Sequence, residues 1–146
     1  HAAAASAPDG VEVALFERLG DLPHFNPDVE AEGTPSAVRE LRCALAESDA
    51  VLIASPEYGH SLPGLLKNAI DWVIGSGELE CKVVAITAAV PGSDRGRQGL
   101  QALRDTLEAV RATIVGGEPI VRGPTFVDEV AELVRALVKR VSDAQP

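Results

Sequence analysis

The sequence contains no Met, one Trp, one Tyr and two cysteines, Cys43 and Cys81, which lie far apart. Neither cysteine has a second thiol or a histidine at the spacing that a metal site needs, so no metal is expected. We interpret both cysteines as reduced, half-buried thiols of a cytoplasmic protein, with a disulfide as the minor alternative. The longest apolar run, residues 83–90, is too short to span a bilayer and contains Thr87, so we expect no membrane partner.

Basic residues are also few. The chain has 13 Lys and Arg against 22 Asp and Glu, and its formal net charge is -9. Binding of nucleic acid is not expected, because phosphate contacts require clustered basic side chains. Neither a G-x-G-x-x-G nor a Walker-type nucleotide loop occurs. The length of 146 residues and the 46% hydrophobic content instead predict one folded domain with a proper core.

Apolar runs alternate with stretches of helical periodicity along the chain. Residues 50–54 and 82–88 are apolar at nearly every position, which predicts strands buried on both faces and central in a sheet. Alternation predicts a further strand over residues 11–16, and residues 114–121 predict an edge strand interrupted by two glycines. Residues 20–35 are expected to be irregular because of their prolines. Helices are predicted over residues 1–7, 34–49, 63–74, 100–110 and 125–141.

This order of strands and helices predicts a three-layer α/β domain with a parallel sheet and right-handed crossovers. In such a sheet, ligands bind at the loops that leave the carboxyl ends of the strands. Two of these loops therefore contain the candidate site, residues 55–61 and residues 88–96.

The loop 55–61 offers a proline, a carboxylate, a phenol, a glycine, an imidazole and a hydroxyl. A planar aromatic ligand suits it, because Tyr58 provides a stacking face and backbone amides can reach polar ring atoms. The alternative is an ordinary strand-to-helix turn in which Ser61 caps the following helix. On this loop alone, the two interpretations have equal weight.

The loop 88–96 favours a ligand site, because two adjacent loops rich in small residues form one concave rim. As structure alone it would be a turn with Ser93 or Asp94 as a helix cap. Arg95 and Arg97 could attract an anionic co-substrate, although arginines of this kind more often lie in solvent.

His60 has no Asp or Ser at a spacing that suggests a catalytic triad, and Ser61 is too close in sequence to be its partner. Hydrolase chemistry is therefore not expected, and no catalytic acid or base is assigned. His24 is interpreted as a packed or solvent histidine. For Glu57, a capping or salt-bridging role is the structural alternative to a place beside the ligand.

The run SPEYGHSLPGLLKNAIDW, residues 55–72, resembles the signature of the NADPH-dependent FMN reductase family, Pro-Glu-Tyr-Asn-x-Ser followed by Leu-Lys-Asn-Ala-Ile-Asp-Trp. A looser similarity extends over residues 22–28 and 88–104. The resemblance implies a flavodoxin-like fold with strand order 2-1-3-4-5. It also implies FMN as cofactor, NADPH or NADH as hydride donor, and a small acceptor such as a quinone, a flavin or an azo compound.

The resemblance also implies a set of residues along the flavin ring. Gly59 stands where the family has Asn, and Arg95-Gly96 where it has Gly-Gly. The implied FMN-binding residues are Pro56, Glu57, Tyr58, Gly59, His60 and Ser61 on one loop, and Ala88, Ala89 and Gly92 on the other.

The family begins with a central strand and a loop that wraps the FMN phosphate, whereas residues 1–7 resemble only the end of the helix that follows them. We therefore expect residues 1–146 to form a single domain that lacks this first strand and the phosphate loop, as an incomplete copy of a longer chain. The resemblance further implies a homodimer or homotetramer. Two alternatives remain open: a flavodoxin-type electron carrier, and a degenerate domain that binds no flavin.

Overall fold

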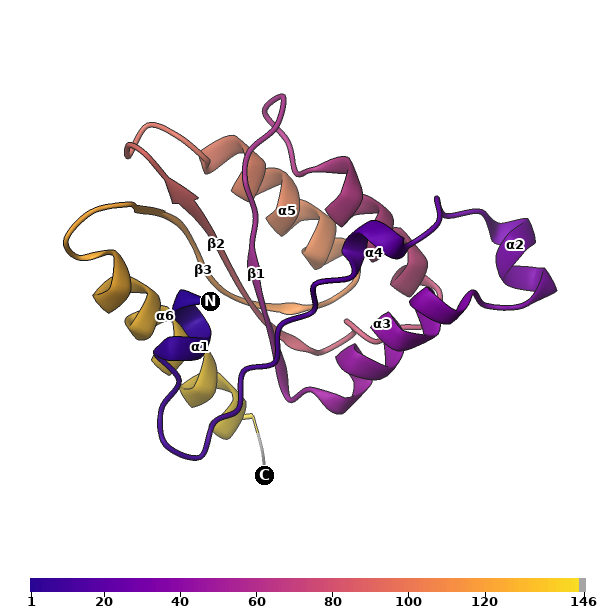
Figure 1. Ribbon diagram of the computed structural model, residues 1–146, viewed down its shortest axis with the longest axis horizontal. Helices are drawn as coiled ribbons and strands as arrows, with labels where there is room; N and C mark the ends of the chain where they lie inside the picture. Colours follow the sequence, from indigo (N-terminus) through magenta and orange to yellow (C-terminus); the bar gives the residue numbers. More distant parts are fainter. Residues whose placement is uncertain (145–146) are drawn as a thin grey trace.

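A three-stranded parallel sheet lies between two layers of helices in the computed structural model, which describes residues 1–144 (Figure 1). The strands, in the spatial order β1-β2-β3, are β1 (Ala50–Ala54), β2 (Val83–Val90) and β3 (Thr113–Val121). The helices are α1 (Ala2–Ala5), α2 (Pro27–Glu32), α3 (Ser36–Glu47), α4 (Gly64–Ile74), α5 (Arg97–Ala109) and α6 (Phe126–Ser142), with a short 3-10 turn over Leu19–Asp21.

The sheet divides the interior into two cores. Val84 and Ile86 of β2 face the larger core, which they share with α3, α4 and α5. Val83 and Ala85 face the opposite side, where Leu137 of α6 packs against them. The expected three-layer α/β architecture is thus confirmed. The five-strand order 2-1-3-4-5 stays a prediction, because the described sheet has three strands.

The two glycines in β3 form a bulge. Gly116 and Gly117 have positive φ values of 72° and 109°, and the register between β2 and β3 shifts beside them. Arg104 Nη2 donates to the carbonyl oxygen of Gly116 at 2.8 Å, and Thr87 Oγ1 donates to that of Glu118 at 3.0 Å. These bonds satisfy backbone groups that the bulge removes from the ladder. The prediction of an interrupted strand is confirmed.

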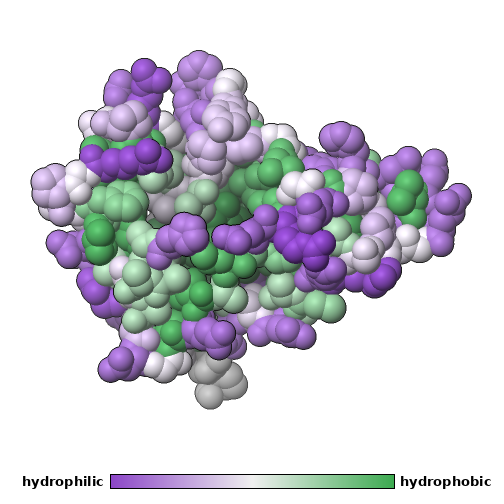
Figure 2. All heavy atoms as spheres, in the orientation of Figure 1, coloured by the Kyte–Doolittle hydropathy of each residue, from purple (hydrophilic) through white to green (hydrophobic). Residues whose placement is uncertain are grey.

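Residues 11–16 do not form the predicted strand. The segment pairs with no strand within residues 1–144, and β1 consequently lies at an edge of the sheet rather than at its centre. The alternating pattern has another cause, since Phe16 packs against the larger core while its neighbours face solvent. In the orientation of Figure 1, Figure 2 shows apolar side chains gathered at the middle of the visible face, between α1 and α6 on one side and α3 and α4 on the other.

Residues 20–35 contain a helix, α2, where an irregular loop was expected. Pro27 lies in its first turn, where a missing N–H breaks no helical bond, and the side chain of Asn26 accepts from Asp28 N at 2.9 Å. The proline therefore starts a helix. The segment is joined to α4 by Asn68, whose Oδ1 accepts from Phe25 N at 2.8 Å.

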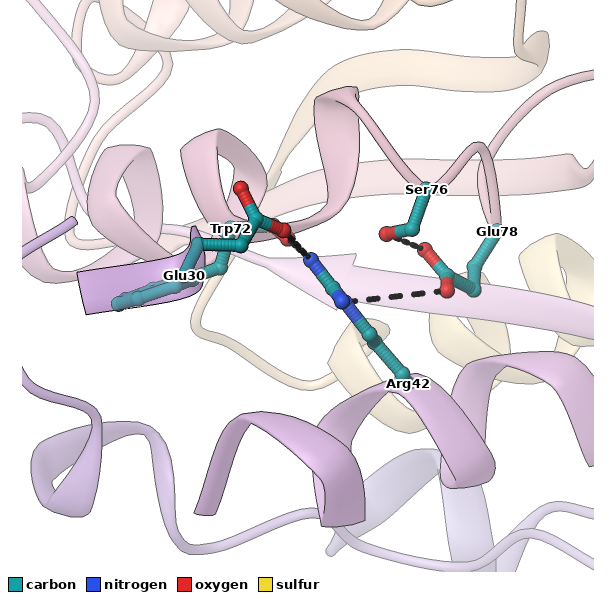
Figure 3. Close-up of polar contacts among 5 residues, drawn as sticks. All are labelled: Glu30, Arg42, Trp72, Ser76 and Glu78. Atoms are coloured by element: carbon teal, nitrogen blue, oxygen red, sulfur yellow. Dashed lines mark hydrogen bonds and ion pairs between the residues drawn. The ribbon is translucent and has the colours of Figure 1, made fainter. Parts of the chain in front are cut away.

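Arg42 of α3 links α2, α4 and the turn that follows α4 (Figure 3). Its Nη2 donates to Glu30 Oε1 at 2.5 Å and to the carbonyl oxygen of Trp72 at 2.6 Å. Its Nε lies 3.9 Å from Glu78 Oε1, and Ser76 Oγ donates to the other oxygen of Glu78 at 2.6 Å. Arg42 is only 18% exposed, so it serves as an internal ion-pair centre.

Among the helices of residues 1–144, none has both the length and the apolar character that crossing a membrane requires.

Candidate functional site

Two loops leave the carboxyl ends of the adjacent strands β1 and β2, at the same edge of the sheet (Figure 1). We call residues 55–63, between β1 and α4, the first loop. Residues 91–96, between β2 and α5, are the second loop. Parallel pairing brings the carboxyl ends of neighbouring strands together, so the expected juxtaposition of the two loops follows from the sheet itself.

The tip of the first loop is a tight hairpin. Tyr58 and Ser61 exchange two backbone hydrogen bonds, each 3.0 Å long, and the two residues between them, Gly59 and His60, have φ values of 57° and 61°. Positive φ at both central positions is the geometry of a type I′ turn, which glycine adopts readily. Ser61 does not cap α4, because the helix begins at Gly64 and its N-cap is Pro63, without a side-chain bond. The alternative interpretation of Ser61 is wrong.

The hairpin places the side chain of Tyr58 in solvent, with 66% of the residue exposed. The base of the loop is fixed by Ser55, which is buried and donates its N–H to the carbonyl oxygen of Thr87 at 2.9 Å. Pro56 accepts from Ser55 Oγ at 3.1 Å. The loop thus presents an exposed aromatic ring on a backbone that β2 holds in place.

Glu57 points from the first loop toward α5. Its Oε2 accepts a hydrogen bond from Gly99 N at 2.9 Å, and its side chain is 22% exposed. The other oxygen, Oε1, lies 4.0 Å from His60 Nδ1. The capping role weighed for Glu57 is therefore present, although the helix that it caps belongs to the other loop.

The second loop is closed by Gly96, which has a φ of 87°. A Cβ atom at this position would lie 2.9 Å from Val90 Cγ1 and 3.2 Å from Ala88 Cβ, so only glycine fits here. Ala88 is buried in the larger core, whereas Ala89 is exposed. Of the three residues expected on this side, Ala89 is exposed and Gly92 is half-buried, whereas the side chain of Ala88 is enclosed.

Backbone donors remain available at the tips of both loops. The N–H groups of Gly59 and His60 on one tip, and of Gly92 and Ser93 on the other, donate no hydrogen bond to any group of residues 1–144. Unpaired N–H groups beside an exposed aromatic ring suit a planar ligand whose edge carries carbonyl oxygens and ring nitrogens.

Some of the charged side chains near this edge are already paired with other side chains. Arg97 Nη1 lies 2.7 Å from Glu118 Oε2, and both side chains are mostly exposed. Arg95 is also exposed. His24 lies on the surface of the segment before α2 and does not join the two loops. Within residues 1–144, no three His, Cys, Asp or Glu side chains gather as a metal site would require.

Gly99 is the participant that the sequence analysis missed. The signal was weak, because the predicted helix 100–110 begins after Gly99, and only the structure places this glycine inside α5, where it weakens a helix by about 1 kcal/mol and so indicates close packing. The position of that packing could not be read from the chain, since Gly99 and Glu57 are 42 residues apart.

A parallel sheet between helical layers, with paired small-residue loops at its carboxyl edge, defines a flavodoxin-like α/β protein. The sequence model of NADPH-dependent FMN reductases matches residues 1–125, and the chain belongs to this family. The resemblance noted in residues 55–72 is therefore confirmed.

Two curated relatives and one solved structure support this assignment. A quinone reductase of Pseudomonas putida is 38% identical over 104 residues, 69% of this chain and 55% of that protein. An NAD(P)H-dependent FMN reductase of Pseudomonas aeruginosa is 41% identical over 92 residues, 63% of this chain and 48% of that protein. The chain thus spans about half the length of these relatives. The flavoenzyme NAD(P)H:acceptor oxidoreductase FerB of Paracoccus denitrificans superposes with a TM-score of 0.83 at 27% identity, over 97% of this chain and 86% of that one.

Proposed function

We propose that this chain binds FMN and belongs to an enzyme that transfers a hydride from NADPH or NADH, through the flavin, to a small acceptor such as a quinone. The observation that carries the proposal is the pair of loops at the carboxyl edge, with exposed Tyr58 on one and unpaired amides on both. Family membership and relatives named as quinone and FMN reductases support the same function.

In this proposal residues Pro56 to Ser61 of the first loop lie along the flavin ring, and Ala89, near the end of β2, and Gly92 of the second loop lie at another edge of it. Tyr58 stacks on an aromatic surface, and the amides of Gly59 and His60 donate to polar ring atoms. Gly59 supplies a backbone donor where the family has an Asn side chain. Ala88 contributes through its backbone, because its side chain is buried.

The flavin, when bound, supplies the hydride chemistry itself. The residues of the chain hold the ring, shield part of it from water and leave the rest open to donor and acceptor. We assign no acid or base among them: His60 is exposed and lies 4.0 Å from its nearest carboxylate oxygen, that of Glu57.

The phosphate of the cofactor is bound elsewhere than at α5. A helix N-terminus is a common phosphate site, but Gly99 N in the first turn of α5 already donates to the carboxylate of Glu57. A second anion at that place would meet like-charge repulsion.

We further propose a homodimer or homotetramer of single-domain subunits. The indole of Trp72 is fully buried, so it is not itself a contact residue, but α4 leaves two of its apolar side chains exposed, Leu65 at 48% and Ile74 at 52%. Exposed apolar groups on one helix suit an interface between copies. Light scattering of the purified protein measures the oligomer directly.

We propose a cytoplasmic location because both cysteines are free thiols. Cys43 and Cys81 are free thiols, and both are exposed rather than half-buried as expected. Free thiols are usual where glutathione keeps cysteines reduced.

The proposal is tested by titrating the purified protein with FMN, following flavin fluorescence, and then recording the absorbance spectrum before and after NADPH is added. We expect stoichiometric binding, loss of the flavin absorbance with NADPH, and steady NADPH oxidation once a quinone is present. An electron carrier would oxidise NADPH only after a separate reductase is added. A protein that stays colourless with FMN would be the degenerate domain.

A further inference from the structure

We infer that Glu57 is a positioning residue that fixes the two loops of the site to each other. The inference rests on the proposed function, because its consequence is the geometry of the FMN site. It concerns a contact between two segments that the chain connects only over a long distance: Gly99 N donates to Glu57 Oε2 at 2.9 Å, and the two residues are 42 positions apart.

The carboxylate supplies a cap that α5 lacks in its own sequence. The N-cap of α5 is Gly96, no side chain there accepts from the first turn, and the first turn contains no acidic residue. An anion at a helix N-terminus is favourable, because the unpaired N–H groups there carry partial positive charge. Glu57 meets this requirement from another loop, so the start of α5 and the first loop are stabilised together.

Gly99 and Glu57 are packed so closely that a side chain at position 99 would clash. A Cβ atom built on Gly99 would lie 2.9 Å from Glu57 Cβ, 3.0 Å from its Cα and 3.1 Å from its Cγ. Cα belongs to the backbone and Cβ is bonded directly to it, so neither atom can move without shifting the loop. Position 99 therefore requires glycine for the two segments to approach.

The contact between Glu57 and Gly99 links the two loops that form the candidate site. Glu57 immediately precedes Tyr58, the first residue of the hairpin, and Gly99 lies in the first turn of the helix that the second loop enters at Gly96. Besides this contact, the first loop is held by Ser55, whose N–H donates to the carbonyl oxygen of Thr87 in β2. Without the carboxylate, the hairpin remains tied to β2 but is no longer fixed relative to α5.

Four variants test this role: Glu57→Ala, Glu57→Gln, Gly99→Ala and the double variant Glu57→Ala/Gly99→Ala. Glu132→Ala is the matched control for a carboxylate, because Glu132 is exposed on α6. Gly75→Ala is the control for a glycine, because a Cβ atom there has no neighbour within 4 Å. For each protein, the FMN dissociation constant, the urea midpoint and the hydrogen exchange rate of the Gly99 amide without ligand are measured.

We expect Glu57→Ala and Gly99→Ala each to weaken FMN binding about tenfold, a free-energy difference of about 1.4 kcal/mol. Glu57→Gln retains an oxygen that accepts from Gly99 N and should stay within about threefold of the unchanged protein. The double variant should resemble the single ones, since either change alone already separates the loops; two independent effects would multiply. The Gly99 amide should exchange at least about tenfold faster in Glu57→Ala and not in either control.

The inference is overturned if Glu57→Ala binds FMN as tightly as the unchanged protein, or if Glu57→Gln loses as much affinity as Glu57→Ala. An unchanged exchange rate at Gly99 in Glu57→Ala would also overturn it. If the unchanged protein binds no FMN, the proposed function fails instead, and the exchange rate still decides whether Glu57 holds the start of α5.

Discussion

The indole Nε1 of Trp72 donates a hydrogen bond to the carbonyl oxygen of Pro23 at 2.7 Å. Asn68, one helical turn earlier, donates to the same oxygen at 3.0 Å. The ring of Phe25 packs edge-on against the indole, with the ring centroids 5.0 Å apart. Residues 68 and 72 of the family signature therefore hold the segment before α2 against the helix that carries them.

Replacing Trp72 with Phe removes the N–H donor and part of a fully buried ring. We expect the free energy of unfolding to fall by about 1–3 kcal/mol, because a hydrogen bond and buried apolar volume are lost together. Urea denaturation measures the change. Tyr58→Phe, at an exposed aromatic position, is the control and should change stability by less than about 0.5 kcal/mol.

Arg42→Met should lower the free energy of unfolding by about 2 kcal/mol, because Glu30 and the carbonyl oxygen of Trp72 both lose a charged donor. Arg18 offers a matched comparison, since it pairs with Asp21 at 2.8 Å but is 54% exposed. For Arg18→Met we expect less than about 1 kcal/mol. Equal effects for the two variants, measured by urea denaturation, would contradict an internal role for Arg42.

Gly116→Ala should destabilise the protein by about 2–4 kcal/mol. Its φ of 72° is unfavourable for alanine, and the added Cβ would lie 2.7 Å from Leu133 Cδ1 and 3.1 Å from the carbonyl oxygen of Ile86. Gly123→Ala is the control, because no atom lies within 4 Å of a Cβ there and its φ is not in the left-handed region. Thermal unfolding should show a clear loss for the first variant and little change for the second.

The type I′ turn predicts a graded response at position 60. His60→Asn should change stability by less than about 0.5 kcal/mol, because asparagine tolerates the φ of 61°. His60→Val should destabilise the turn by about 1–2 kcal/mol, since a β-branched side chain is strained there. The FMN dissociation constant should rise for Val and not for Asn. A valine variant that binds FMN normally would show that the turn does not set the site.

The sequence was most informative where periodicity is strong. Val83 to Val90 and the helices before and after it follow from apolar spacing alone, and the signature around Glu57 and Tyr58 identified the family. Residues 11–16 were misassigned because alternation reports which side chains are buried, whereas a strand also needs a partner for its backbone.

Other features required the structure. Pro27 reads as a helix breaker or a helix start depending on its position, and the preceding Asn26 was the signal for a start. The burial of Arg42 depends on partners from three separate elements. No spacing rule connects Glu57 with Gly99, because only the pairing of β1 with β2 brings them together.

The shape of the hairpin at the tip of the first loop does not depend on the side chain of His60. Backbone bonds between Tyr58 and Ser61 define its shape, and the side chain of His60 is 73% exposed with no hydrogen bond within residues 1–144. Residues that accept left-handed backbone can therefore be exchanged at position 60 without altering the scaffold. Position 60 is therefore the place where a new side chain can be presented beside the proposed FMN site without moving the backbone.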